Sequence, residues 1–275
     1  MLMFSNFVLI AHRGFSAQAP ENTIAAFDLA IESGYTDIEF DIQLSKDGVP
    51  VVFHDFTVDR TTNGKGRVDA HTFDELQALD AGSWFDASFA GQHIPSLKEI
   101  LLIYRGRANI HIELKSIEPD MPLKVAELLA STGWVDDATA LPYLRAFRRP
   151  LLIISSFDRM QVARSMERLP HSIVHELLVE NVSDESLQWA ADHGIRSYNP
   201  DGKDITPELV RKAHKLNLHV GAWWWTREEQ IAYPNIRASG ASSTFIDALP
   251  RRHPLIARHP ALKHALTQVT QDLLQ

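Results

Sequence analysis

Three carboxylates lie at short intervals on two apolar segments of the sequence. Glu39 and Asp41 are two residues apart in DIEFDIQL, residues 37–44, and Glu113 lies in NIHIELK, residues 109–115. Because side chains alternate between the two faces of a strand, Glu39 and Asp41 point the same way. On an exposed antiparallel strand this alternation would mark only a solvated face. In a closed parallel barrel the carboxylates would lie inside, where unpaired charge is very costly.

Something must then neutralise these carboxylates, and a hard divalent cation with oxygen ligands suits them. We therefore predict one divalent cation, Mg²⁺ or Ca²⁺, on Glu39, Asp41 and Glu113. Asp37 and His111 lie on the same faces but further back, and we interpret them as polar residues packed low in the barrel.

Two histidines end extended segments in the same way. His12 follows FVLIA, residues 7–11, and His54 ends the run VVFH. A lone histidine is more often a satisfied structural residue. Two of them beside a metal site could instead serve as general base and general acid around one bond, because imidazole titrates near neutrality.

Fixed positive charge accompanies these groups. Arg13 follows His12, and Lys115 lies on the same strand face as Glu113. Both could bind an anionic substrate, arginine by gripping two phosphate oxygens at once. Ion pairing with the same carboxylates is the alternative, and the residues leave both open. Glu21 precedes a helix that Asn22 or Thr23 could cap, where it would favour the helix dipole or act as a second-layer partner of the site.

The run of three tryptophans, Trp223 to Trp225, is expected in the core, because strand alternation buries rings on both sides of a barrel strand. Trp225, nearest the end of the strand, is the candidate for lining a substrate pocket. The segment TNGKG, residues 62–66, lacks the spacing of a phosphate-binding loop and the helix that must follow one, so we interpret it as a turn.

For these side chains to form one site, the strands that carry them must end at the same edge of a sheet. Short apolar runs alternate with amphipathic segments almost throughout the chain, which is typical of strands joined by crossover helices. The strand candidates span residues 7–11, 37–44, 109–115, 151–156, 173–179, 195–199, 219–225 and 243–248, and the helix candidates include 22–33, 121–131, 158–168, 184–193 and 206–216. Eight strand–helix repeats favour a closed α/β barrel of the TIM type over an open doubly wound sheet. We expect residues 1–275 to form one domain.

Two segments depart from this repeat. Residues 49–105 carry a further extended run and a short helical piece, which indicates a small insertion at approximately residues 56–105 above the strand ends. Near the C-terminus, apolar residues form one helical stripe, so we expect an extra helix at approximately residues 260–274.

Composition narrows the class of protein further. The 275 residues are 45% hydrophobic and 23% charged, which is ordinary for a globular chain, and the net charge of -8 would repel nucleic acid. There is no cysteine, which excludes a disulfide framework. No apolar stretch approaches the roughly 20 residues that span a bilayer, and the first residues lack the features of a cleaved leader. We therefore expect a cytoplasmic protein without stable membrane insertion.

Several motifs together resemble the glycerophosphodiester phosphodiesterase family. They are AHRGFSAQAPENTIAAF, DIEFDIQLSKDGVPVVFHDFTVDRTTNGKGRV, IPSLKEIL, IHIELK, SSFD and WWWT, in the family's order from residue 10 to about residue 226. The resemblance implies a TIM barrel with a small insertion between the second and third barrel strands. It also implies a divalent metal on Glu39, Asp41 and Glu113, His12 and His54 as the acid–base pair, and Arg13 and Lys115 on the phosphate.

The implied activity is metal-dependent hydrolysis of a glycerophosphodiester, a small-molecule substrate, to sn-glycerol 3-phosphate and an alcohol. The alternatives are a lysophospholipase D-like enzyme and a catalytically silent barrel that only binds metal or phosphoesters. The resemblance weakens at the eighth strand, where SGASSTFIDALP keeps Asp247 and Pro250 but lacks the family's threonine and tyrosine. This departure concerns specificity, because every proposed catalytic position is present.

Overall fold

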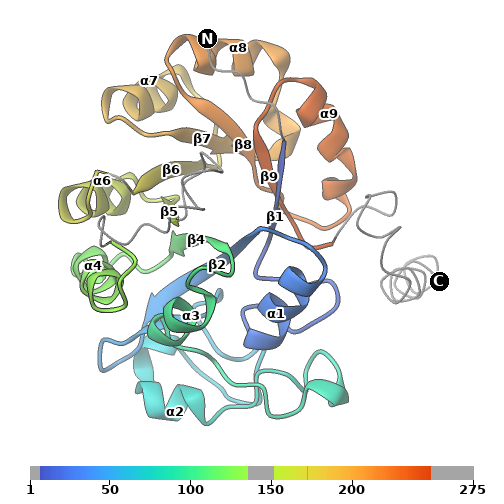
Figure 1. Cartoon of the computed structure of the whole chain (residues 1–275), viewed down its shortest axis with the longest axis vertical. Coiled ribbons are helices and arrows are strands. Elements are labelled where there is room, and N and C mark those ends of the chain that lie inside the picture. The colour runs from blue at the N-terminus through green and yellow to red at the C-terminus, as the bar shows by residue number, and fades with distance from the viewer. Residues whose placement is uncertain (1–6, 136–151, 172, 249–275) are drawn as a thin grey trace.

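Parallel strands form a closed barrel in the computed structural model, which describes residues 7–135, 152–171 and 173–248 (Figure 1). The barrel strands are β1 (Val8–Ala11), β2 (Asp37–Leu44), β4 (Asn109–Leu114), β5 (Leu152–Ser156), β6 (Val174–Val179), β7 (Ser197–Pro200), β8 (His219–Ala222) and β9 (Ser243–Ile246). Each pairs with its neighbour in parallel, and β1 pairs with both β9 and β2, which closes the ring. The predicted TIM barrel is confirmed.

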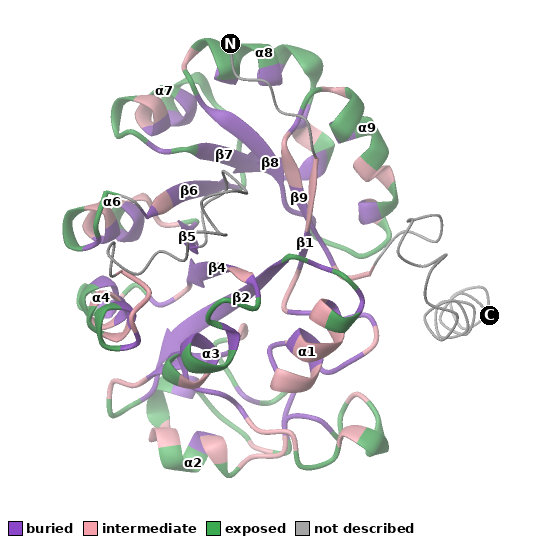
Figure 2. Ribbon diagram, viewed as in Figure 1, coloured by how far each residue is buried: buried purple, intermediate pink, exposed green. Residues whose placement is uncertain are grey.

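Helices surround this ring and cover the outer face of its strands, most of whose residues are buried (Figure 2). They are α1 (Ile24–Glu32), α3 (Leu97–Tyr104), α4 (Met121–Ser131), α6 (Arg159–Arg168), α7 (Asp184–Asp192), α8 (Pro207–Lys215) and α9 (Tyr233–Ala238). Phe27 of α1 meets Phe40 of β2 and Tyr104 of α3 edge to face, at ring-centroid distances of 5.7 and 5.8 Å. Every residue of β2 is buried, so its acidic side chains must be satisfied inside the protein.

The chain segment that connects β2 to β4 forms an additional layer. The short strand β3 (Pro50–Val52) pairs antiparallel with β2 outside the barrel, and η1 (Val68–Ala70), α2 (Phe73–Gln77) and η2 (Ala87–Phe89) follow it. Val51, Val58 and Leu76 are among the buried residues of a small apolar core within this layer. Because β3 is fixed to β2 in this way, the residues that follow β3 are held above the barrel mouth.

The structure corrects the predicted strand over residues 219–225, because β8 ends at Ala222. Its neighbour β7 ends at Pro200 and turns into η4 (Gly202–Asp204), so only an isolated bridge from Asp201 reaches Trp223. After Trp225 the chain continues into η5 (Glu229–Ala232). Trp223 and Trp224 are buried as expected, whereas Trp225 is 61% exposed.

Two further predictions concern the start of the first helix and an extra helix near the C-terminus. The first helix begins at Ile24 rather than at residue 22, since Thr23 is its N-cap and accepts a hydrogen bond from the Ala26 amide. The predicted C-terminal helix at residues 260–274 lies outside the described residues. Within the described ranges, none of the helices has the length and apolar character needed to cross a bilayer.

Candidate active site

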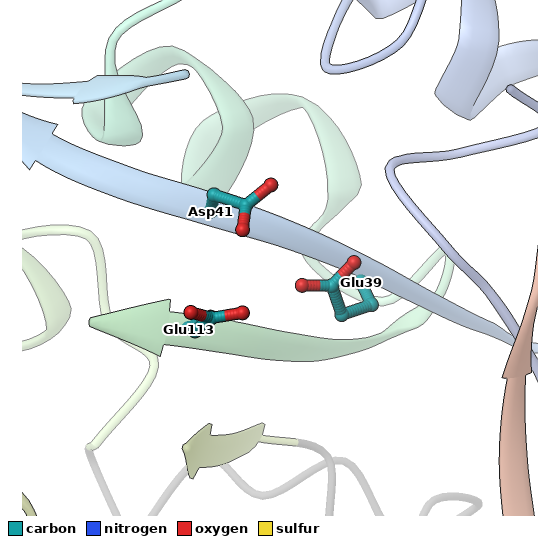
Figure 3. Close-up of side chains that lie close together, drawn as sticks. All are labelled: Glu39, Asp41 and Glu113. Carbon is teal, nitrogen blue, oxygen red and sulfur yellow. The ribbon is translucent and has the colours of Figure 1, made fainter. Parts of the chain in front are cut away.

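Three carboxylates converge at the mouth of the barrel, from two adjacent strands (Figure 3). The strand register sets Asp41 of β2 directly beside Glu113 of β4, and Glu39 lies two residues earlier on the same face of β2. Each residue offers one oxygen within 4.8 Å of the other two. The fold thus gathers the three residues that the sequence suggested as metal ligands.

Without a bound cation, the three carboxylates of this cluster repel one another, and their pKa values reflect this repulsion. Burial, together with the negative charges of Asp41 and Glu113, raises the pKa of Glu39 well above its ordinary value. Burial also raises the pKa of Glu113, with Asp41 adding to the effect and Lys115 opposing it. Burial acts the same way on Asp41, but the nearby charges of His54, Arg13 and Lys115 outweigh it and lower the pKa of Asp41.

This donor set fits a divalent cation. The Oδ1 atom of Asp41 is buried and accepts no hydrogen bond, although Lys115 Nζ lies 3.6 Å away. The other oxygen, Oδ2, accepts a hydrogen bond of 2.9 Å from Asn22 Nδ2, which fixes the carboxylate orientation. Clustered carboxylate oxygens are the ligands that Mg²⁺ and Ca²⁺ prefer, and a bound cation would remove the mutual repulsion.

Arg13 is held against this cluster by an unusual backbone conformation. Its φ of 56° lies in the left-handed region, and Gly14 follows at φ 81°, where an added Cβ would come within 2.7 Å of Ala26. The turn aims the Arg13 amide at Glu39 Oε2, at 3.0 Å. The guanidinium lies 3.4 Å from Asp41 Oδ2 and donates to Glu21 Oε1 at 2.9 Å.

His12 lies immediately after β1 and is paired with a carboxylate. Because Ala11 of β1 is in register with Ile246 of β9, the next residues of the two strands, His12 and Asp247, become neighbours. His12 Nδ1 lies 2.8 Å from Asp247 Oδ1. Partial burial of Asp247 opposes its ionisation, but the bond to His12 and the charge of Arg227 lower its pKa below the ordinary value. An ionised Asp247 accepts from Nδ1, which leaves Nε2 of the imidazole for proton transfer.

His54 has a matching partner in the residue that follows it. His54 Nδ1 lies 2.6 Å from Asp55 Oδ1, and Gln43 Nε2 donates to the backbone carbonyls of this turn, at 3.0 Å for His54 and 2.6 Å for Asp55. Burial opposes the ionisation of Asp55, but its hydrogen bonds with His54 and Arg60 lower its pKa. Both histidines therefore have one ring nitrogen engaged by a carboxylate.

Arg60 ties the two sides of the site together. Its Nε and Nη2 donate to the two oxygens of Asp55 at 2.7 and 2.9 Å, and its Nη1 and Nη2 donate to Glu21 at 2.8 and 2.7 Å. Glu21 in turn holds Arg13. The arginine thus connects the carboxylate behind His54 with the carboxylate behind Arg13.

A cavity of about 690 Å³ opens beside the carboxylates. Its polar lining includes His12, Arg13, Glu39, His54, Glu113 and Lys115, so six of the predicted site residues face one space. Trp225 also lines this cavity, and Asp41 lies behind Glu39 and Glu113 with no exposed surface. Glu21 lies in a neighbouring smaller cavity that shares His12 and Arg13.

Four contributors were not predicted from the sequence to be site residues, although Asn22 was named as a possible helix cap and Asp247 as a retained motif residue. Asp55 and Asp247 orient the histidines, Asn22 holds Asp41, and Arg60 links Glu21 with Asp55. The directly adjacent His54–Asp55 pair was a signal for Asp55, and the retained aspartate of the eighth strand was one for Asp247. Nothing in the spacing of Arg60 pointed to its role, because its partners depend on how the insertion folds.

Comparisons with known proteins agree with this geometry. Residues 12–238 match the model of the "Glycerophosphoryl diester phosphodiesterase family". The chain is 55% identical over 243 residues to "Putative glycerophosphodiester phosphodiesterase YhdW" of Bacillus subtilis (strain 168), covering 87% of this chain and 93% of the relative. It is 36% identical over 228 residues to a glycerophosphodiester phosphodiesterase of Caldanaerobacter subterraneus subsp. tengcongensis, covering 82% and 88%.

A solved structure has the same fold. It is a phosphodiesterase of Oleispira antarctica in complex with the product sn-glycerol-3-phosphate, and it aligns with a TM-score of 0.75 and 27% identity. The alignment covers 87% of this chain and 92% of that one.

Proposed function

This chain belongs to the glycerophosphoryl diester phosphodiesterase family and is an enzyme of that class, and we propose that it hydrolyses glycerophosphodiesters to sn-glycerol 3-phosphate and an alcohol with His12 and His54 as its acid–base pair. The product bound to the Oleispira antarctica relative supports this choice of product. The observation that carries the mechanism is that each histidine is backed by its own aspartate while lining one cavity with the carboxylate cluster.

Substrate binding is assigned to the charged end of the cavity. Glu39, Asp41 and Glu113 would hold one Mg²⁺ or Ca²⁺ ion, which when bound would act as a Lewis acid on the phosphoryl group. Arg13 and Lys115 lie against the same carboxylates, at 3.4 Å and 3.6 Å from Asp41. Their guanidinium and ammonium groups bind phosphate oxygens and offset the negative charge that builds up in the transition state.

Proton transfer is assigned to the two imidazoles. One ring accepts the proton of the attacking hydroxyl, from water or from the substrate's own glycerol, as that oxygen bonds to phosphorus. The other ring donates a proton to the departing alcohol oxygen as its bond to phosphorus breaks. Attack by water gives sn-glycerol 3-phosphate directly, whereas attack by the glycerol hydroxyl gives a cyclic phosphate that a water molecule then opens to the same product. Asp247 and Asp55 keep each ring in the tautomer and orientation that these transfers need.

Single replacement of either histidine tests the assignment. H12A and H54A should each lower kcat for glycerophosphodiester hydrolysis by about 10²-fold or more, the usual contribution of a proton-transfer group. The assay measures sn-glycerol 3-phosphate released by metal-reconstituted protein. H193A, at the exposed C-terminal end of α7, is the matched control and should keep normal turnover. Near-normal hydrolysis by both site variants would refute the acid–base pair.

A further inference from the structure

Part of the cavity lining is aromatic. Phe157 follows β5, and Trp223 and Trp225 follow β8; all three side chains line the cavity. The ring of Trp223 meets Phe157 at a centroid distance of 5.1 Å and an interplanar angle of 82°, and meets Trp225 at 4.8 Å and 77°. Nearly perpendicular rings form corners, in which a rounded group can touch two ring surfaces at once.

Two of these rings, those of Trp225 and Phe157, are accessible although they are large and apolar, whereas Trp223 is buried behind them. Trp225 is 61% exposed and Phe157 is 36% exposed, and Phe56 and Ile117 are exposed on the same cavity lining. Apolar side chains gathered at the opening of a catalytic cavity indicate a ligand that covers them. The proposed hydrolysis gives these apolar side chains no role, because metal binding, phosphate binding and proton transfer are assigned to other residues.

Charge distinguishes between the ligands that could cover the rings. Glu180 and Asp158 line the same cavity, and Glu180 makes no ion pair with any residue that the structure describes. Arg13 and Lys115 lie against Asp41 of the metal-binding cluster. The cavity lining therefore holds two further carboxylates, Asp158 and Glu180, which belong neither to that cluster nor to the histidine–aspartate pairs. An acyl chain gains nothing from Glu180, whereas a cation is attracted both by the carboxylate and by the ring faces.

We propose that this enzyme selects glycerophosphodiesters whose alcohol carries a quaternary ammonium group, as choline does. The trimethylammonium group is held in the corners formed by Phe157, Trp223 and Trp225, with Glu180 as the nearby counter-charge. Aromatic rings attract a quaternary ammonium group through the negative charge of the ring face. This attraction needs no hydrogen-bond donor on the ligand. The inference rests on the proposed function, since it names the alcohol that the same hydrolysis releases.

The experiment compares two substrates that differ only in charge. These are glycerophosphocholine and its 3,3-dimethylbutyl analogue, in which a tert-butyl group replaces trimethylammonium. The expected ratio of their kcat/KM values in the wild type is about 10, within the range of cation–aromatic attraction. W225L and E180Q should each lower this ratio toward 1, and W225F, which keeps a ring face, should retain part of it. W189L, on the outer helix α7, is the control that should leave the ratio unchanged.

A binding measurement separates this inference from the proposed function. Tetramethylammonium should inhibit competitively and quench tryptophan fluorescence, with an inhibition constant several-fold higher in W225L. A wild-type ratio of 1 or less would overturn the inference while leaving phosphodiesterase activity intact. If no glycerophosphodiester is hydrolysed, the proposed function fails, and tetramethylammonium binding still decides whether the aromatic site exists.

Discussion

At the scale of single residues, each histidine of the site contacts one aspartate. His12 and His54 differ in their places on the chain but share one arrangement, in which Nδ1 faces an aspartate and the ring lines the cavity. The three buried carboxylates lack such individual partners and share Arg13, Lys115 and a prospective cation. Proton transfer and metal binding are thus assigned to separate groups of residues that face one cavity.

The aspartates behind the histidines give the first prediction at this scale. D247N and D55N place an amide where Nδ1 needs an acceptor, so each should lower kcat by roughly 10²-fold or more with KM and metal affinity nearly unchanged. Steady-state kinetics and metal titration measure the two quantities separately. D192N, at the surface end of α7, controls for loss of a carboxylate. Equal kcat in D247N and wild type would remove Asp247 from the mechanism.

At the scale of elements, the loops that follow the strands carry the site, and Arg60 connects two of them. It joins the turn after β3 to the loop between β1 and α1, through Asp55 and Glu21. The small core around Val58 and Leu76 keeps the insertion in the position from which Arg60 reaches both. The side chain of Arg60 thus links the insertion to the loop after β1.

Replacing Arg60 should therefore slow the reaction without removing any reacting group. Lysine cannot bridge two carboxylates with a planar fork, so R60K should lower kcat by about 10-fold while metal affinity stays the same. The control is R67K, since Arg67 pairs with the exposed Asp69 within the insertion. A change in metal affinity as large as the change in kcat would mean that Arg60 acts on the carboxylate cluster instead.

A second element-scale prediction concerns the contact of β6 with α6. His175 of β6 bonds to Ser165 of α6 at 2.9 Å, and burial lowers the pKa of His175 to about 4. In the unfolded chain His175 binds a proton near pH 6.5, whereas in the folded chain it stays neutral down to about pH 4. The folded state therefore keeps its full stability above pH 6.5 and loses stability as the pH falls from 6.5 toward 4.

Between pH 7 and pH 5 this one group should remove about 2 kcal/mol from the free energy of unfolding. Urea unfolding at the two pH values measures the loss, and H175Q should lack that share of it. H214Q, an exposed histidine of α8, should keep the full loss. The same slope in H175Q and wild type would contradict the assignment to His175.

At the scale of the whole molecule, closure of the barrel and the metal site are coupled. The carboxylates lie on β2 and β4 inside the ring, so the repulsion that raises the pKa of Glu39 is present only in the folded state. A bound cation removes this repulsion and binds the folded chain selectively.

Chelation should accordingly destabilise the protein. Mg²⁺ or Ca²⁺ at 100 times its dissociation constant should add about 2.7 kcal/mol to the free energy of unfolding and raise Tm by several degrees. Thermal melts with and without a chelator measure the difference. D41N, which removes one ligand oxygen, should melt at the same temperature in both conditions, and a metal-dependent rise that persists in D41N would place the ion elsewhere.

The sequence by itself determined the barrel, the carboxylate cluster and the residues expected around it. These depend on short-range regularities: alternation places Glu39 and Asp41 on one face, and repeated strand–helix units lead to a closed parallel sheet. The tertiary structure alone decided the pairing of His12 with Asp247, which are 235 residues apart, and the reach of Arg60 to Glu21. It also decided that Trp225 stands exposed beside Trp223, because β8 ends where its neighbour turns away. Such contacts depend on strand register and loop path, which residue spacing along one chain does not encode.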